Sequence, residues 1–238
     1  MYLIKKLTKR LSIILLCSWC VTSVQAANID DFQSWLSLAI VGRLGSENEA
    51  LSKVRYEFIA QERTADDSTR FFQSLLRTGA GYQITHHSSL WLGYDWLHTN
   101  DVFVPVAIDT STPWQQFMWE NTYEYFSFMS RTRLEEQFVE GNDDMGWRVR
   151  QMLQFSIPIT AIPDLAILTF DELFVNLNGI SGIDDPGTIQ NRLFLGLTYG
   201  VSEHVVTQLG YMNQYIEDFE NDSYLNNILF LGLVLRFN

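Results

Sequence analysis

Polar and apolar side chains alternate with a period of two residues along most of this chain. Between residues 53 and 63 the odd positions are mostly charged or amide-bearing, whereas the even positions are Val54, Tyr56, Phe58 and Ala60. Successive side chains of a β-strand point to opposite faces, so the pattern predicts a strand with one polar and one apolar face. An α-helix would instead repeat its apolar side chains every three or four residues.

The same alternation recurs to the end of the chain. In the last segment Leu229, Leu231, Leu233 and Leu235 fall on one face of the predicted strand. The segment 165–177 shows the weakest alternation, because Asp171 and Glu172 are adjacent and one of them must lie on the apolar face or near a rim. The predicted strands are 32–42, 51–63, 70–83, 89–98, 114–123, 131–140, 146–157, 165–177, 189–200, 205–217 and 225–237.

The first 26 residues differ from everything that follows. Four basic residues precede an almost wholly apolar stretch from 11 to 20, and Val24-Gln25-Ala26 precedes an expected cleavage before Ala27. This is the layout of a secretory signal peptide. The apolar stretch has about half of the roughly 20 residues that a membrane-spanning helix needs, so a cleaved leader is favoured over an anchor. We therefore expect a signal peptide over 1–26 and one domain over 27–238.

Removal of the leader would change the composition of the protein. Cys17 and Cys20 would leave with it, and 12 basic residues would remain against 28 acidic ones, a net charge of −16. A chain without thiols can form no disulfide, thiolate metal site or cysteine nucleophile. The acidity excludes nucleic acid as a partner, because its phosphates would be repelled.

Strands can cross a membrane only as a closed barrel, since every backbone polar group must be paired inside hydrocarbon. The predicted segments have about the 9–11 residues that a transmembrane strand needs. Aromatic residues near strand ends, such as Tyr82 and Trp147, suit the girdles at the membrane interfaces. The alternative is a secreted soluble β-barrel or sandwich, but Lys53 is the single lysine after residue 26, unlike a typical solvated face.

The expected fold class is therefore all-β, an antiparallel transmembrane β-barrel in the outer membrane of a Gram-negative bacterium. Its expected partners are outer-membrane lipid, lipopolysaccharide and the barrel-assembly machinery. Single-chain bacterial barrels carry even numbers of strands. We therefore expect twelve strands, with a further one over Val102–Ile108, and ten as the alternative.

The predicted connections are of two kinds. Short ones lie near 85–88, 160–164 and 201–204, and longer acidic ones lie at 64–69, 98–113, 140–145, 179–188 and 217–224. Long outer loops that alternate with short periplasmic turns are typical of outer-membrane barrels. One hairpin sequence occurs twice: the segments 82–94 and 199–211 both begin with Tyr and end with Gly-Tyr.

Four runs carry a family resemblance. RTRLEEQFVEGNDDMGWRVR, DELFVNLN, IQNRLFLGLTYG and LGYMNQY resemble, in order and across nearly the whole mature chain, the bacterial family of domain of unknown function 2490. Members of that family are thought to be outer-membrane barrels, so the resemblance implies the same fold. It carries no established activity, so no catalytic residue is transferred.

The polar faces predict an inward-pointing network. Such side chains could plug the lumen as Arg–carboxylate pairs or form a narrow constriction selective for small anions or polar solutes. The function we expect is therefore structural or that of a narrow solute channel. The candidate lumen residues are Arg55, Glu57, Arg77, Asp95, Arg133, Glu135, Arg148, Arg150, Glu172, Arg192 and Gln214.

Two other functions are weaker alternatives. Acidic loops could serve a surface adhesion or interaction barrel, and their paired aspartates could bind divalent cations, but none has EF-hand spacing. A lipid-acting hydrolase would need a His–Ser pair, and only His98 lies near the outer rim, with Ser111 as its nearest partner and no nucleophile motif. We expect no enzyme activity, no catalytic residue, no metal site and no cofactor.

Overall fold

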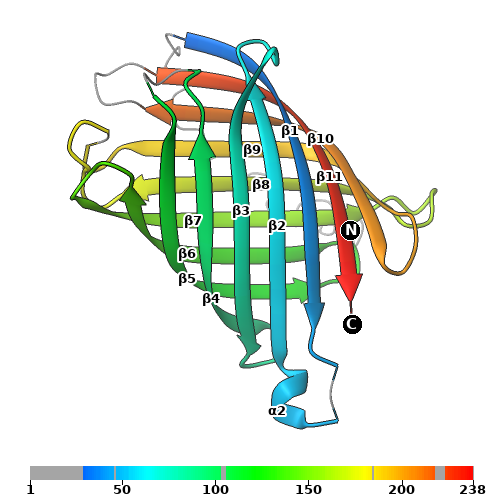
Figure 1. Ribbon diagram of the computed structural model, residues 1–238. Coiled ribbons are helices and arrows are strands. Elements are labelled where there is room, and N and C mark those ends of the chain that lie inside the picture. Colours follow the sequence, from blue (N-terminus) through cyan, green and yellow to red (C-terminus); the bar gives the residue numbers. More distant parts are fainter. Residues whose placement is uncertain (1–28, 46, 103–105, 184, 218–222, 238) are drawn as a thin grey trace, which may run out of the picture.

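The computed structural model describes residues 29–45, 47–102, 106–183, 185–217 and 223–237. Within these residues eleven strands form one closed barrel in which sequence neighbours are spatial neighbours, and β11 closes the sheet against β1 (Figure 1). The strands are β1 (Ile29–Arg43), β2 (Val54–Ala65), β3 (Arg70–Gln83), β4 (Ser88–Thr99), β5 (Ile108–Thr122), β6 (Ser127–Val139), β7 (Met145–Pro158), β8 (Leu165–Asn176), β9 (Ile189–Gly200), β10 (Val205–Glu217) and β11 (Ser223–Phe237).

The expected strand number of twelve, with ten as the alternative, is wrong for the described residues. Each of the eleven predicted segments corresponds to a strand, and the odd number is accommodated because β1 and β11 pair in parallel while all other pairs are antiparallel. The extra strand over Val102–Ile108 falls partly outside the described residues, and Ile108 is the first residue of β5. An even number is required only when every pair is antiparallel.

Alternate side chains of each strand point into and out of the barrel. On β2, Gln61 and Arg63 are buried, whereas Phe58 is 40% exposed. On β3, Arg77 is buried and the neighbouring Leu76 is 40% exposed. The polar face of the sequence pattern therefore points inward, and the apolar face forms the outer wall.

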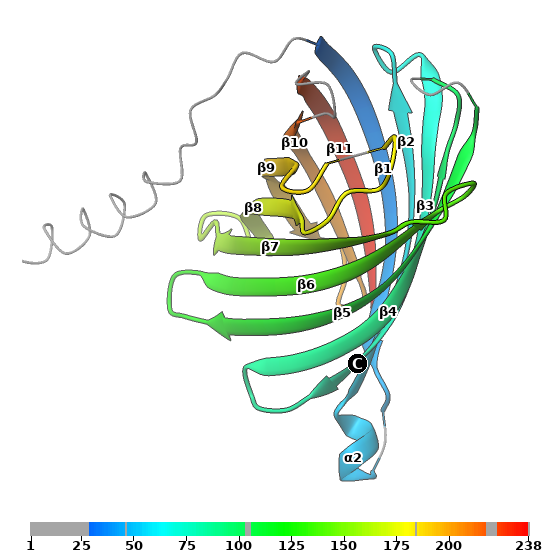
Figure 2. The ribbon, with the colours of Figure 1, turned by 90° about the vertical axis from the view of Figure 1, so that its left-hand side faces the viewer.

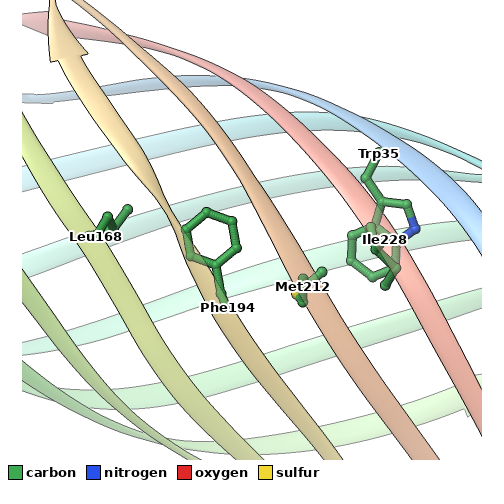
Figure 3. Close-up of a cluster of buried hydrophobic side chains, with 5 residues drawn as sticks. All are labelled: Trp35, Leu168, Phe194, Met212 and Ile228. Atoms are coloured by element: carbon green, nitrogen blue, oxygen red, sulfur yellow. The ribbon is translucent and has the colours of Figure 1, made fainter.

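Part of the interior is apolar. Phe170 and Phe230 pack against a buried cluster, and the rings of Phe170 and Phe194 stack with centroids 4.9 Å apart. The cluster comes from β1 and from β8 to β11, so it fills one side of the lumen. Its members are Trp35, Leu168, Phe194, Met212 and Ile228 (Figure 3).

The repeated hairpin sequence has a packing reason. A Cβ atom on Gly93 would lie 2.1 Å from Cζ2 of Trp114, and one on Gly210 would lie 2.4 Å from Cζ of Phe194. In both hairpins the glycine leaves room for an aromatic ring from an adjacent strand. The tyrosine that follows each glycine lies on the outer face.

The two ends of the barrel differ, and β1 and β11 run in the same direction between them (Figures 1 and 2). One end, which we call the acidic end, carries the connections 66–69, 100–107, 140–144 and 177–188. The other, the short-turn end, carries the turns 84–87, 123–126, 159–164 and 201–204, together with α2 (Glu49–Ser52). Ile29 therefore lies at the acidic end and Phe237 at the short-turn end.

Two predicted loops are shorter in the structure. The connection between β2 and β3 is the turn 66–69, and the loop expected over 98–113 shrinks to 100–107 because β4 continues to Thr99 and β5 begins at Ile108. Among the described residues, no helix has the length and apolar character needed to cross a membrane.

Candidate functional site in the barrel lumen

Arg77 and Asp95 form a buried ion pair between β3 and β4. The two residues are register partners, and Arg77 Nε donates to Asp95 Oδ1 at 2.8 Å while its Nη2 donates to Oδ2. Trp114 Nε1 also donates to Asp95 Oδ1, at 2.6 Å. A guanidinium fork on a carboxylate is a strong and directional pairing, so Asp95 is fixed in place with donors on both oxygens.

Arg133 of β6 lies deep in the lumen and is 1% exposed. Its Nε and Nη2 donate to Gln116 Oε1 at 2.9 and 2.7 Å, and its guanidinium lies 3.9 Å over the ring of Trp114. Arg133 Nη2 also lies 3.8 Å from Glu57 Oε1 on β2, a strand four places away around the barrel. This contact spans the lumen between non-adjacent walls.

Glu135 is fully buried and is shared by three guanidinium groups. Arg148 Nη2 lies 2.7 Å from Glu135 Oε2, and Arg150 Nη1 donates to Oε1 at 2.7 Å. Arg133 Nη1 lies 3.9 Å from Oε1. A buried carboxylate requires such compensation, because an unpaired charge is costly away from water.

Glu172 extends this network toward β8. Arg150 Nε and Nη2 donate to Glu172 Oε1 at 3.0 and 2.8 Å, and Arg131 Nη2 donates to the same oxygen at 2.6 Å. Because Arg150 binds both Glu135 and Glu172, the ion pairs form a continuous chain from β6 to β8. The adjacent Asp171 points outward and accepts from Asn191 Nδ2 at 2.5 Å.

Two arginines in the lumen contact neutral partners. Arg63 Nη1 donates to Gln73 Oε1 at 2.8 Å and lies 4.0 Å over the ring of Trp35. The Arg192 guanidinium lies 5.0 Å from the same ring. Its Nε donates to the side-chain oxygen of Gln190 at 2.9 Å when the Gln190 amide is oriented with that oxygen toward the arginine. Aromatic faces attract guanidinium groups, so Trp35 holds both cations beside the apolar cluster.

The described network carries more positive than negative charge. It contains seven arginines against four carboxylates, an excess of three positive charges. Arg55 and Glu120, whose Nη1 and Oε1 atoms lie 2.7 Å apart, balance each other nearer the short-turn end. The seven arginines are Arg63, Arg77, Arg131, Arg133, Arg148, Arg150 and Arg192, and the carboxylates are Glu57, Asp95, Glu135 and Glu172.

A cavity of about 510 Å³ opens at the short-turn end of the lumen. The Arg55–Glu120 pair lies in its wall, and His87 of the β3–β4 turn contacts the carbonyl oxygen of Glu120 through Nδ1 at 3.2 Å. The cavity is lined by Arg43, Arg55, His86, His87, Glu120, Asn121, Thr122, Ser127, Phe128, Met129, Gln154 and Ser156.

The structure brings most of the sequence-derived lumen residues together. Ten of the eleven contact another member of the set or an aromatic ring of the lumen, and Arg55 pairs instead with Glu120. Gln214 lies beside Arg192 and accepts from Asn226 Nδ2 at 3.0 Å. Arg63 and Arg131 are not among the residues predicted to point inward, although each lies an even number of residues from a predicted lumen residue on the same strand. The alternation of side chains along each strand is therefore sufficient to predict that both point into the lumen.

The outer wall near the acidic end carries a separate polar group. His98 Nδ1 and Asp109 Oδ1 are 2.5 Å apart, and Trp96 Nε1 donates to Asp109 Oδ2 at 3.2 Å. The hydroxyl of Ser111 instead pairs with that of Tyr94, at 2.7 Å. His98 is thus oriented by an acid, but the hydroxyl group expected as its partner is hydrogen-bonded to another side chain. The absence of enzyme activity stays a prediction.

Two connections at the acidic end are tied together. Asp144 Oδ2 accepts from the hydroxyl of Ser181 at 2.5 Å and from its backbone N–H at 3.2 Å. Asn142 Nδ2 donates to the carbonyl oxygen of Ser181 at 2.8 Å, and Asn178 Nδ2 donates to that of Met145 at 2.7 Å. We call these contacts the loop latch. Over the described ranges, no cluster of three or more His, Cys, Asp or Glu side chains could hold a metal ion.

Comparison with known proteins gives a family but no activity. The model of the family described as "Protein of unknown function (DUF2490)" matches residues 32–225. An uncharacterised protein of Methylorubrum extorquens is 25% identical over 230 residues, which cover 94% of this chain and 97% of that protein. No solved structure matches. The chain therefore belongs to the DUF2490 family of proteins of unknown function.

Proposed function

We propose that this protein is an outer-membrane β-barrel whose lumen is closed by its own ion pairs and which serves a structural role. The contact between Arg133 and Glu57 carries this proposal, because it joins strands four places apart across the lumen. Arg133 and Glu135 are 1% and 0% exposed, so the chain excludes solvent at this level. An open porin would instead leave such side chains hydrated around a channel.

The outer wall supports a membrane location. Leu36, Leu92 and Leu195 are 61%, 66% and 61% exposed, and each lies on a different part of the wall. A soluble barrel that exposed so many large apolar side chains would aggregate, whereas lipid accommodates them. The proposed signal peptide over 1–26 lies outside the described residues. Lipopolysaccharide, outer-membrane lipid and the barrel-assembly machinery are the partners that this location would supply.

Planar bilayers test the closed lumen. The purified full-length protein, refolded until its electrophoretic mobility changes on heating, should give no discrete conductance steps after insertion. An open porin inserted by the same procedure is the control for reconstitution. Regular conductance steps from the wild-type protein would contradict the proposal and favour the narrow channel. In that case the excess of three lumen arginines predicts a preference for anions.

A surface interaction is the second candidate function. The loop latch ties the connection 140–144 to the segment around Ser181, and ordered loops bind partners with a smaller loss of conformational entropy than flexible loops. Replacement of both Asn142 and Asp144 by alanine should weaken attachment of cells to a surface if these loops bind it. Unchanged attachment, with unchanged barrel folding, would count against this function.

A further inference from the structure

The cavity at the short-turn end spans the mouth of the lumen. It is lined by Arg43 at the end of β1 and by Gln154 and Ser156 near the end of β7, two strands on opposite sides of the eleven-stranded barrel. The alternation along each strand points these side chains inward. The cavity volume of about 510 Å³ falls within the roughly 300–1,000 Å³ of typical small-molecule sites. The mouth of the lumen therefore has room for a ligand.

The lining of this cavity is cationic, although the whole protein is acidic. Its two arginines face a single carboxylate, that of Glu120, which is already paired with Arg55 at 2.7 Å. Arg43 forms no ion pair or side-chain hydrogen bond with any residue that the structure describes. Other acids at this end, such as Glu124 and Glu203, lie in exposed turns and do not line the cavity. The cavity therefore has one arginine whose charge is not compensated.

The lumen beyond the cavity adds to this positive charge. The ion-pair network described above has three more arginines than carboxylates. One of these arginines, Arg131, lies one inward position deeper on β6 than Met129 of the cavity lining. Protein walls of low dielectric constant screen such charges less than water does. The electrostatic field at the mouth of the lumen therefore favours an anion.

Two buried polar atoms below the cavity have no hydrogen-bond partner among the described residues. They are Nε of Arg131 and Oε1 of Glu57, and Glu57 lies one inward position deeper on β2 than Arg55 of the lining. Buried polar atoms are normally paired with protein groups or with ordered water. A polar molecule that reached the floor of the cavity would supply such partners.

We propose that this cavity binds a small soluble molecule with a carboxylate or phosphate group, and that Arg43 is its main charged contact. A planar guanidinium group matches either oxyanion with two parallel N–H···O bonds. The hydroxyl and amide groups of Thr122, Ser127, Gln154 and Ser156 also line the cavity and can bond the uncharged part of such a molecule. Ligand binding at this end goes beyond the structural role proposed above.

The place of the cavity selects the source of the ligand. The short turns of outer-membrane barrels face the periplasm, so the ligand would enter from that compartment. A free anion reaches the lumen through its mouth, whereas a lipid headgroup remains tied to acyl chains outside the wall. Only the choice of compartment rests on the proposed membrane location; the cavity and its charge do not depend on it.

Calorimetric titration of the purified, folded protein in an uncharged detergent tests the site. Inorganic phosphate and succinate are the probes, and at least one of them should bind saturably, with one site per chain. Arg43→Gln keeps a long polar side chain but removes its charge, so it should weaken that binding about tenfold or more.

Arg70→Gln at the acidic end is the matched control. Arg70 is also an exposed arginine, with its Nη2 atom 3.8 Å from Asp101 Oδ1, and it lies far from the cavity lining. Its substitution should leave the affinity for the probe unchanged. No saturable binding of either probe, an unchanged affinity of the Arg43→Gln protein, or equal weakening by both substitutions would overturn the proposal.

A bulky side chain distinguishes the cavity from the open surface around Arg43. Ser156→Trp should abolish binding because the indole ring would occupy the cavity, whereas Glu203→Trp in an exposed turn should not. Full binding by a Ser156→Trp protein whose mobility still changes on heating would contradict a site in the cavity. Displacement of the probe by phosphatidylglycerol in the detergent, but not by soluble anions, would overturn the soluble ligand. Conductance and membrane fractionation test the closed lumen and the location separately, so failure of this site is distinguishable from theirs.

Discussion

Glu135 shows how a single residue depends on its surroundings. Its carboxylate is fully buried and contacts the guanidinium groups of Arg148 and Arg150 at 2.7 Å. Replacement by glutamine leaves these cations short of charge compensation, and loss of one partner from a buried pair costs about 3–5 kcal/mol. We therefore expect Glu135→Gln to lower the free energy of unfolding by that amount, measured by urea titration in lipid vesicles.

The matched control is Glu62→Gln on the outer face. The Glu62 carboxylate is exposed and accepts one hydrogen bond, from Ser74 Oγ at 2.8 Å. Its loss should cost less than about 1 kcal/mol, as for other exposed polar contacts. Equal effects of the two substitutions would show that the lumen ion pairs contribute little to stability.

Gly93 gives a second prediction for a single residue. A methyl group at this position would meet Trp114 at 2.1 Å and the carbonyl oxygen of Thr78 at 2.5 Å. Overpacking of this kind costs about 1–3 kcal/mol, so Gly93→Ala should lower the urea midpoint. Gly45→Ala is the control, because no atom lies within 4 Å of the added carbon. A Gly93→Ala protein as stable as the Gly45→Ala protein would contradict the packing reason for the repeated hairpin.

Among the elements, strand location and facing could be predicted from sequence, whereas the pairing inside the barrel could not. The alternation of side chains predicted that Arg150 and Glu172 point inward, and both are buried in the structure. The sequence left the adjacent Asp171–Glu172 pair in doubt, and the structure places Asp171 on the outer face, where it contacts Asn191. The alternation did not predict the partner of Arg133. Its contact with Glu57 depends on how the five strands from β2 to β6 are shifted relative to one another along the barrel. The sequence also did not predict that the barrel closes through the parallel pair β1 and β11. The alternation of polar and apolar residues in a strand is the same whether its neighbour runs parallel or antiparallel to it.

The loop latch predicts a pH effect at the level of two connections. The Ser181 hydroxyl and backbone N–H donate to Asp144 and hold the pKa of its carboxyl below the ordinary aspartate value. A lowered pKa in the folded state means that the contact stabilises the loops above that ordinary value and is lost as the pH falls through the lowered pKa. The connections 140–144 and 177–183 should therefore loosen under acid conditions.

Hydrogen exchange of the Ser181 amide measures this loosening. Its protection should fall below about pH 4, near the ordinary aspartate pKa. Asp144→Asn should remove the pH dependence, because asparagine does not titrate and offers a weaker acceptor. Protection that stays constant down to pH 2, or that declines equally in the variant, would show that Asp144 does not control the latch.

At the scale of the whole molecule, the apolar outer wall and the charged lumen reverse the usual arrangement of a soluble protein. The network of seven arginines and four carboxylates lies inside the barrel, while residues such as Leu36 and Leu195 are exposed on its outer wall. The proposed outer-membrane location would account for this arrangement, because lipid would cover the apolar wall.

Location is the most direct test of this account. Membranes of cells that express the protein are separated by density, washed with urea, and analysed before and after boiling. We expect the protein in the outer-membrane fraction, resistant to extraction, with a mobility that changes on heating. Protein recovered from the soluble periplasm in folded form would contradict the membrane barrel and, with it, the explanation of the apolar wall.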